Sequence, residues 1–182
     1  MKKVAIVIFI YVMITALGAC GIQATSTATG LSETSTYKAS VTETKTAGNN
    51  VWIKVGKVVT VEDIQYTVSG FKYSNGSADF APEAGNSYCL IDISVKNNTK
   101  KEAPISSMLM FDLTDADGKS YDISLGGLVS LEGEKLAQLD GNVAASSEMR
   151  GGLAYEVPQN AKGITLAIKE ILGDGELKVK LN

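Results

Sequence analysis

The sequence contains no histidine and few of the residues that build reactive sites. Its 182 residues include only two cysteines, one tryptophan and three prolines. Without histidine the chain lacks the commonest general base and the commonest transition-metal ligand. A Ser-His-Asp triad, a Cys-His dyad and a histidine-ligated zinc site are therefore excluded. We expect a protein that is not an enzyme and that needs no metal or other cofactor.

Positive charge is also scarce. The chain has 17 lysines and arginines against 20 acidic residues, and Arg150 is the single arginine. Nucleic-acid binding needs a basic stripe that contacts phosphates. We therefore expect no nucleic-acid partner. The content of 45% apolar and 20% charged residues is typical of a globular protein, and the length is typical of one domain.

The first 19 residues have the features of a secretory signal. Lys2 and Lys3 form a short basic region, and Val4–Leu17 is an apolar run interrupted only by Thr15. About 20 apolar residues are needed to span a bilayer, so this run is shorter than a typical transmembrane helix. Its dimensions match the apolar region of a signal peptide, which we expect over residues 1–19.

The signal ends in a motif that resembles the lipobox of bacterial lipoproteins, Leu17-Gly18-Ala19-Cys20. In such proteins a diacylglyceryl group is attached to the cysteine, and cleavage leaves that cysteine as the new N-terminus. The resemblance implies lipidation of Cys20 and a lipid anchor on the extracytoplasmic face of the cell membrane. An ordinary secretory signal and a short uncleaved N-terminal anchor are the alternatives.

Residues 20–50 differ in composition from the rest of the chain. Between Gly21 and Asn50 there are eight threonines and four serines, with few large apolar side chains. Such a segment cannot bury enough surface to offset the entropy of ordering it. We expect the lipidated Cys20 and a flexible tether over residues 20–50, and a folded domain over residues 51–182.

The second cysteine has no partner for a disulfide if Cys20 carries the lipid. Cys89 lies in phase with Ile91, Ile93 and Val95, which alternate with more polar residues. We therefore expect Cys89 to be a small buried hydrophobic residue and not a reactive thiol.

Apolar and polar residues alternate in several short runs after residue 51. The clearest runs are 64–69, 89–96, 153–157, 164–169 and 177–181. Alternation with a period of two is typical of antiparallel strands that have one buried face and one solvent face. About seven or eight such strands over one domain predict an all-β protein, an immunoglobulin-like antiparallel β-sandwich.

Turn residues separate these runs. Asp115–Gly118 lies between predicted strands at residues 108–114 and 119–123, and the glycine can adopt the positive φ that a hairpin needs. Another predicted turn is Gly173–Gly175. We expect no more than a turn or two of helix, over Ser130–Leu139, because Gly133 and the glycines around it disfavour a long helix.

The order of the strands resembles a known family. The matching pieces are Tyr88–Asn98, Phe111–Leu113, the Asp117-Gly118 hairpin, Gly151–Pro158 and the last apolar strand. They resemble the telokin-like, immunoglobulin-like domain of unknown function that many bacterial lipoproteins carry, mostly Gram-positive ones. The mycobacterial secreted immunoprotective antigen belongs to the same superfamily. The resemblance covers about residues 51–182 and implies an extracytoplasmic sandwich domain, but no activity and no functional residues.

The acidic residues between Asp112 and Asp122 raise the question of calcium binding. An EF-hand loop with Gly118 at its sixth position would place Leu113 at the first position and Ser124 at the twelfth. Neither residue supplies a carboxylate, so the pattern fails at both ends. We expect Asp115 to form the turn, and whether the hairpin binds any ion stays open at this point.

A candidate partner-binding loop consists of Phe71, Tyr73, Asn75 and Phe80. Exposed aromatic rings suit a protein or glycan partner, although core packing is the competing role for the same rings. We expect a cell-surface lipoprotein that presents a non-enzymatic binding domain to a protein or cell-wall partner. The alternative is an extracytoplasmic enzyme or an envelope subunit that captures a small ligand.

Overall fold

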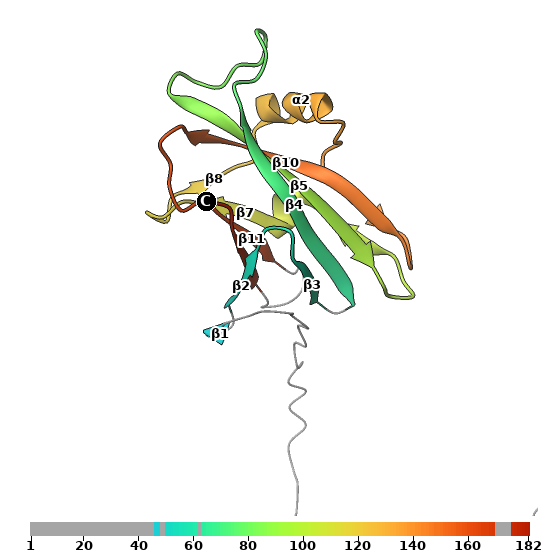
Figure 1. Cartoon of the computed structure of the whole chain (residues 1–182). Coiled ribbons are helices and arrows are strands. Elements are labelled where there is room, and N and C mark those ends of the chain that lie inside the picture. The colour runs from blue at the N-terminus through green and yellow to red at the C-terminus, as the bar shows by residue number, and fades with distance from the viewer. Residues whose placement is uncertain (1–45, 48–49, 62, 170–175) are drawn as a thin grey trace, which may run out of the picture. The chain divides into compact units, whose positions relative to one another are not determined.

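Two β-sheets pack face to face in the computed structural model of the chain (Figure 1). The structure describes residues 46–47, 50–61, 63–169 and 176–182. The predicted signal peptide, the lipobox Leu17-Gly18-Ala19, the lipidated Cys20, nearly all of the predicted tether and the turn Gly173–Gly175 lie outside the described residues. Among the described residues, no helix has the length and apolar character needed to cross a bilayer.

The first sheet has four antiparallel strands in the order β10-β5-β4-β3. Their bounds are β3 (Val58–Val61), β4 (Ile64–Ser74), β5 (Asn86–Asn97) and β10 (Glu148–Pro158). Strands β5 and β10 pair from Asn86 opposite Pro158 to Lys96 opposite Glu148, and β5 also pairs with β4 from Ile64 opposite Asn97 to Ser74 opposite Tyr88. These long pairings make β5 the central support of the first sheet.

The second sheet has six strands in the order β1-β2-β12-β11-β7-β8. Their bounds are β1 (Thr46–Ala47), β2 (Asn50–Lys54), β7 (Phe111–Thr114), β8 (Ser120–Tyr121), β11 (Thr165–Lys169) and β12 (Glu176–Lys180). All neighbours are antiparallel except β2 and β12, which run parallel with Asn50 opposite Glu176. The parallel pair joins segments that are far apart in the sequence.

The predicted all-β sandwich is confirmed, with differences in detail. The described residues contain twelve strands instead of about seven or eight, because several strands are only two or three residues long. Two of these short strands, β6 (Ala103–Ile105) and β9 (Gly141–Val143), form a separate pair.

The core lies between the two sheets and follows the predicted alternation. The first sheet contributes the alternate residues Cys89, Ile91, Ile93 and Val95 of β5, all 0% exposed. The second sheet contributes Leu113, Leu166 and Leu177, which are also buried. Full burial of one such side chain stabilises the fold by about 1.5–3 kcal/mol. The hydrophobic core therefore holds the two sheets together.

Helix α2 (Leu125–Gly133) covers the outer face of the first sheet, over β10 and β5 (Figure 1). Its Leu131 is 1% exposed and packs in a second apolar cluster with Tyr88, Leu90 and Ala154 of the sheet. The Ser124 side chain caps the helix by accepting a hydrogen bond from the backbone N–H of Gly127. The helix thus covers part of the outer face of the first sheet, over β10 and β5, whereas Lys96 and Arg150 on these strands stay exposed.

The expected short helix is present in this region, but its position differs from the predicted one. The helix lies before most of the predicted segment Ser130–Leu139, and it includes three glycines. Glycine costs a helix about 1 kcal/mol relative to alanine. Here it allows close packing, because a Cβ on Gly126 would lie 2.5 Å from the Tyr88 hydroxyl oxygen. Tertiary packing therefore outweighs helix propensity at this site.

A single helical turn, α1 (Ser107–Met110), replaces the start of the strand predicted from residue 108. The Ser107 backbone N–H and hydroxyl donate to the Asp140 carboxylate at 2.7 and 2.8 Å, and the Gln138 amide donates to the Ser107 hydroxyl at 2.9 Å. These side-chain bonds hold the turn, so β7 begins only at Phe111.

Candidate functional site

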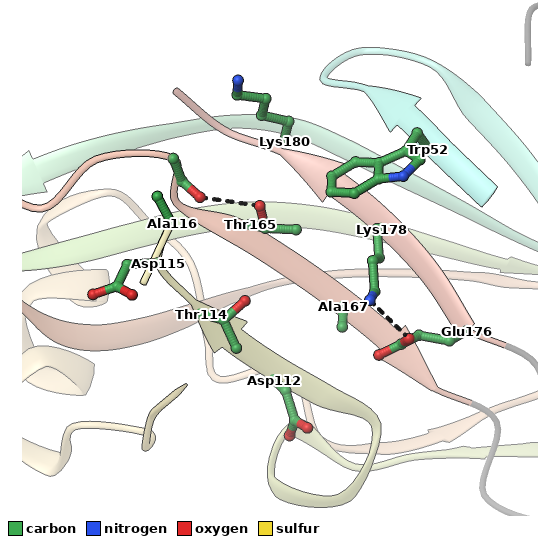
Figure 2. Close-up of a pocket in the computed structure, with 11 residues that line it drawn as sticks. Trp52, Asp112, Thr114, Asp115, Ala116, Thr165, Ala167, Glu176, Lys178 and Lys180 are labelled. Atoms are coloured by element: carbon green, nitrogen blue, oxygen red, sulfur yellow. Dashed lines mark hydrogen bonds and ion pairs between the residues drawn. The ribbon is translucent and has the colours of Figure 1, made fainter. Parts of the chain in front are cut away.

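The outer face of the second sheet carries an open groove of about 370 Å³ (Figure 2). Strand register brings its lining together from four strands. Trp52 on β2 lies beside Lys178 on β12, Lys178 lies beside Ala167 on β11, and Ala167 lies beside Asp112 on β7. One row across the sheet therefore presents an indole, an ammonium group, a methyl group and a carboxylate.

A second row of the same face lies next to the first. Lys54 is opposite Lys180, Lys180 is opposite Thr165, and Thr165 is opposite Thr114. In both rows the residue on β11 is small, and Thr165 and Ala167 are only 9% and 5% exposed. The residues on both sides have longer side chains, except for Thr114. The sheet is therefore hollowed along β11, which forms the floor of the groove.

Trp52 stands at one side of this floor. Ile53 is 6% exposed and belongs to the core, so its neighbours Trp52 and Lys54 face outward. The Trp52 side chain is 46% exposed, and Figure 2 shows it next to Lys178. An indole that is half in water keeps a large apolar face available for contact.

Charged residues on the four strands of the groove form two ion pairs. Lys178 pairs with Glu176 at 3.2 Å, and Lys169 pairs with Asp112. Both pairs are partly exposed, so each stabilises the fold by no more than about 1 kcal/mol. The pairs fix donor and acceptor groups along both sides of the floor.

Two further lysines, Lys54 and Lys180, lie opposite each other on β2 and β12. Neither has an ion-pair partner in the part of the chain that the structure describes. Like charges on neighbouring strands repel each other. The four strands of the groove carry Lys54, Lys169, Lys178 and Lys180 against the carboxylates of Asp112 and Glu176, and Asp115 adds a third carboxylate at the end of the groove. The excess of positive charge is therefore a single charge, and it arises from Lys54 and Lys180.

Asp115 lies at the end of the groove, and the β7–β8 hairpin uses its carboxylate. Oδ1 accepts the backbone N–H groups of Asp117 at 3.0 Å and Lys119 at 2.9 Å, while Oδ2 accepts the Tyr121 hydroxyl at 2.6 Å. The Tyr121 hydrogen bond, followed by these N–H groups, lowers the pKa of Asp115. Burial and the bond to Asp115 raise the pKa of Tyr121 to about 12.

The prediction that Asp115 forms the turn is confirmed, and Gly118 has the expected positive φ of 80°. Among the described residues, no three histidine, cysteine, aspartate or glutamate side chains gather in a way that could hold a metal ion.

The predicted partner-binding loop is partly exposed. Phe71 packs against the core, whereas Tyr73 and Phe80 are 45% and 46% exposed and Asn75 is also exposed. The rings of Phe71 and Tyr73 meet edge to face at 6.0 Å, and the Tyr73 hydroxyl accepts a hydrogen bond from Asn182 at 3.0 Å. Phe80 shares no ring contact with either of them in the described part of the chain. A binding role for this loop stays a prediction.

Cys89 is buried, as the sequence predicts. Its side chain is 0% exposed, and burial raises the pKa of the thiol to about 12. The thiolate is the reactive form of cysteine, and it is strongly disfavoured here at neutral pH. Cys89 is therefore a packing residue.

Sequence reasoning did not find the groove. Its lining comes from residues 52, 112–116, 163–167 and 176–180, which only the sheet topology brings together. One local signal was available. In Thr165–Lys169 the solvent-facing positions begin with the small residues Thr165 and Ala167, and a shallow outer face could have been expected there.

The molecule is thus a β-sandwich domain with one sheet partly covered by a helix and one sheet open to solvent. Residues 53–179 match the family described as domain of unknown function DUF4352, and the chain belongs to this family. No curated protein sequence matches the chain. The resemblance that the strand order suggested is confirmed.

Solved structures agree with this fold. The yjhA protein from Bacillus subtilis is 20% identical, with a TM-score of 0.55, and the match covers 71% of this chain and 98% of that one. The secreted protein MPT63 from Mycobacterium tuberculosis is 16% identical, with a TM-score of 0.51 and coverage of 74% and 99%. A conserved hypothetical protein from Bacillus anthracis is 14% identical, with a TM-score of 0.52 and coverage of 71% and 94%.

Proposed function

We propose that this chain is a lipid-anchored surface protein whose β-sandwich binds a partner outside the membrane and catalyses no reaction. The groove along β11 carries the proposal, because it combines an exposed indole with hydrogen-bonding and charged groups on rigid strands. The lipobox at Leu17–Cys20 and the Thr- and Ser-rich residues 21–50 support the location. MPT63, which is similar in fold, is described as a secreted protein.

Three features favour binding over catalysis. The chain has no histidine, and the thiol of Cys89 is buried with a raised pKa. At the groove itself, the Asp115 carboxylate accepts three hydrogen bonds from the hairpin and is not poised as a general base. The groove therefore offers contact surface and not a nucleophile with its base.

Crosslinking on intact cells tests where the partner binds. A photoreactive residue at position 178, in the groove, should yield a crosslinked species that the same residue at position 96 does not yield. Lys96 is exposed on β5 of the first sheet and serves as the matched control. A third position, 80, tests the predicted loop. Crosslinks from position 80 alone would move the binding surface to Phe71–Phe80 and contradict the groove.

Anchoring is tested separately with Cys20→Ser. Loss of the acylated thiol should release the chain into the medium, because stable anchoring depends on the acyl chains. Retention of the variant in the membrane fraction would contradict lipid anchoring at this residue.

Capture of a small ligand is the second candidate function, and the volume of the groove favours it. Small-molecule sites have volumes of about 300–1,000 Å³, and this groove falls in that range. The same crosslinking experiment separates the two cases. A small ligand would produce no crosslinked macromolecule from position 178, whereas a polymer or protein partner would.

A further inference from the structure

We infer that the groove binds an acidic glycan, that is, a chain of sugar rings that carry carboxylate or phosphate groups. The inference rests on the proposed binding function and names the ligand class. Three features support this inference: an exposed indole, fixed hydrogen-bonding groups along the floor of the groove, and a pair of lysines beside the indole.

The indole of Trp52 supplies a surface for a sugar ring. Sugar rings have an apolar face of C–H groups and a rim of hydroxyls, and the apolar face stacks on aromatic side chains. Trp52 is 46% exposed and stands on β2, where the burial of Ile53 in the core fixes its direction. Binding could therefore cover the ring without rearranging the sheet.

The floor and the opposite side supply groups for the hydroxyls of a sugar. The Thr165 hydroxyl donates to the Gly163 carbonyl at 3.1 Å, so its oxygen keeps its acceptor capacity. The ion pairs Lys178–Glu176 and Asp112–Lys169 hold charged donors and acceptors at set positions. Sugar hydroxyls both donate and accept, so they match such mixed pairs better than an apolar ligand does.

The pair Lys54 and Lys180 favours a ligand with negative charge. Lys54 and Lys180 are opposite each other and have no ion-pair partner among the described residues. A repulsive pair of this kind breaks the usual pattern of cross-strand neighbours, and such departures concentrate at functional sites. An anionic group on the ligand would relieve the repulsion. Trp52 and Lys54 are two residues apart on the same face of β2, so one sugar unit and its charge can meet both.

The groove is open to solvent and lies on a sheet face, so it can accept part of an extended ligand (Figure 2). A nucleic acid also combines rings with charge, but arginine is the residue that most often reads its base edges. The single arginine of the chain, Arg150, lies on β10 of the first sheet and pairs with Asp92 there. The absence of arginine from the groove favours a glycan over a nucleic acid.

The test is a calorimetric titration of the full chain, purified in detergent, with four probes. Oligogalacturonate carries sugar rings and carboxylates, a glycerol- or sugar-phosphate polymer carries phosphates, cellohexaose carries rings without charge, and polyphosphate carries charge without rings. We expect binding of the first or the second probe, which separates the two sources of charge. Binding should weaken between about 50 and 500 mM salt. Binding of polyphosphate as tight as that of both glycans, or of cellohexaose alone, would overturn the inference.

Variants locate the binding. Trp52→Ala should weaken binding of the preferred probe by about tenfold or more, and Lys180→Gln by about threefold with a smaller salt dependence. Lys96→Gln removes an exposed charge on the first sheet and should leave affinity unchanged. Phe80→Ala is a useful comparison, because Phe80 is as exposed as Trp52. Loss of affinity in Phe80→Ala but not in Trp52→Ala would place the site on the loop and contradict the inference.

The proposed ligand class and the proposed binding function can be disproved separately. Suppose that no acidic glycan binds, but that Trp52→Ala abolishes the crosslink formed from position 178 on cells. The proposed binding function is then supported, and the proposed ligand class is wrong. If no acidic glycan binds and the crosslink is also unaffected by Trp52→Ala, both are wrong.

Discussion

The two sheets of the sandwich share one core but differ on their outer faces. The first sheet is partly covered by α2, which buries Leu131 against Tyr88 and Ala154. The second sheet has no described element over β11, and its outer face contains Trp52 and several charged side chains. A face that is covered contributes to stability, whereas a polar face that is left open with an exposed indole is available for recognition.

Small residues lie on the outer faces of both sheets, but they allow close packing on one face and leave a hollow on the other. On β10 of the first sheet, Gly152 makes room for the side chain of Leu131, which packs on it from α2. On β11 of the second sheet, Thr165 and Ala167 leave a hollow between longer side chains. The comparison teaches that the role of a small residue depends on what lies above it. It also predicts that substitutions on the two faces affect different measurements.

The largest expected effect on stability is that of Leu131→Ala, which removes the main apolar contact under α2. Leu131 is 1% exposed, and truncation of a buried leucine costs about 2–5 kcal/mol. Denaturant unfolding would measure the loss. Because the groove lies on the other sheet, ligand binding under folding conditions should be unchanged. A loss below about 1 kcal/mol would show that the covered face contributes little to stability.

A smaller loss is expected from Gly151→Ala in the same sheet. The added Cβ would lie 2.9 Å from the Leu139 Cα and 3.0 Å from the Ala137 carbonyl oxygen, and neither backbone atom can move easily. Overpacking of this kind costs about 1–3 kcal/mol. Gly70→Ala on β4 is the matched control, since a Cβ there meets nothing within 4 Å. Equal unfolding midpoints for the two variants would contradict the close packing on β10.

The carboxylate of Asp115 holds the β7–β8 hairpin of the open sheet. Its contribution to the stability of the fold should depend on pH. The Tyr121 hydrogen bond, followed by the hairpin N–H groups, lowers the pKa of Asp115 in the folded state below its ordinary value of 3.8. The stabilisation is therefore present above that value and is lost as the pH falls through the lowered pKa. Asp115→Asn should reduce the melting temperature at neutral pH.

The reduction should shrink as the pH falls through the lowered pKa of Asp115, because the wild-type carboxyl is then protonated in both states. Thermal unfolding of the two proteins across the acid range is the measurement. A difference in melting temperature that is constant from neutral to acid pH would show that the charge of Asp115 does not matter.

The smallest expected effect on stability is that of Trp52→Ala. Its side chain is 46% exposed, so we expect a change in unfolding free energy below about 1 kcal/mol. Binding of the ligand should fall in the same variant. Together with Leu131→Ala, this variant separates a face that stabilises from a face that binds. A large loss of stability in Trp52→Ala would show that the indole is a structural residue.

Much of the fold could be predicted because the signals are local. The alternation of Cys89, Ile91, Ile93 and Val95 reports directly on which face of β5 is buried, and Gly118 marks its hairpin within a few residues. Helix α2 could not be predicted in the same way. Gly126 and Gly127 disfavour a helix by themselves, and their close approach to Tyr88 on a distant strand is what favours glycine there.

The groove depends even more on distant contacts. The parallel pairing of β2 with β12 places Trp52 beside Lys178, and no sequence pattern specifies that pairing. The antiparallel register of β11 and β7 then places Ala167 beside Asp112. Aromatic residues near a turn, such as Tyr73 and Phe80, were easier to notice because they are close together in the sequence.

The most direct test of the account is the accessibility of Trp52, the only tryptophan of the chain. Its fluorescence can be quenched with acrylamide in the purified full-length protein, with and without envelope material from the producing cells. Since the ring is 46% exposed in the free chain, we predict that envelope material reduces quenching and shifts the emission to shorter wavelength. Unchanged quenching and emission, with the protein demonstrably bound to the envelope material, would contradict the claim that the open sheet face is the binding surface.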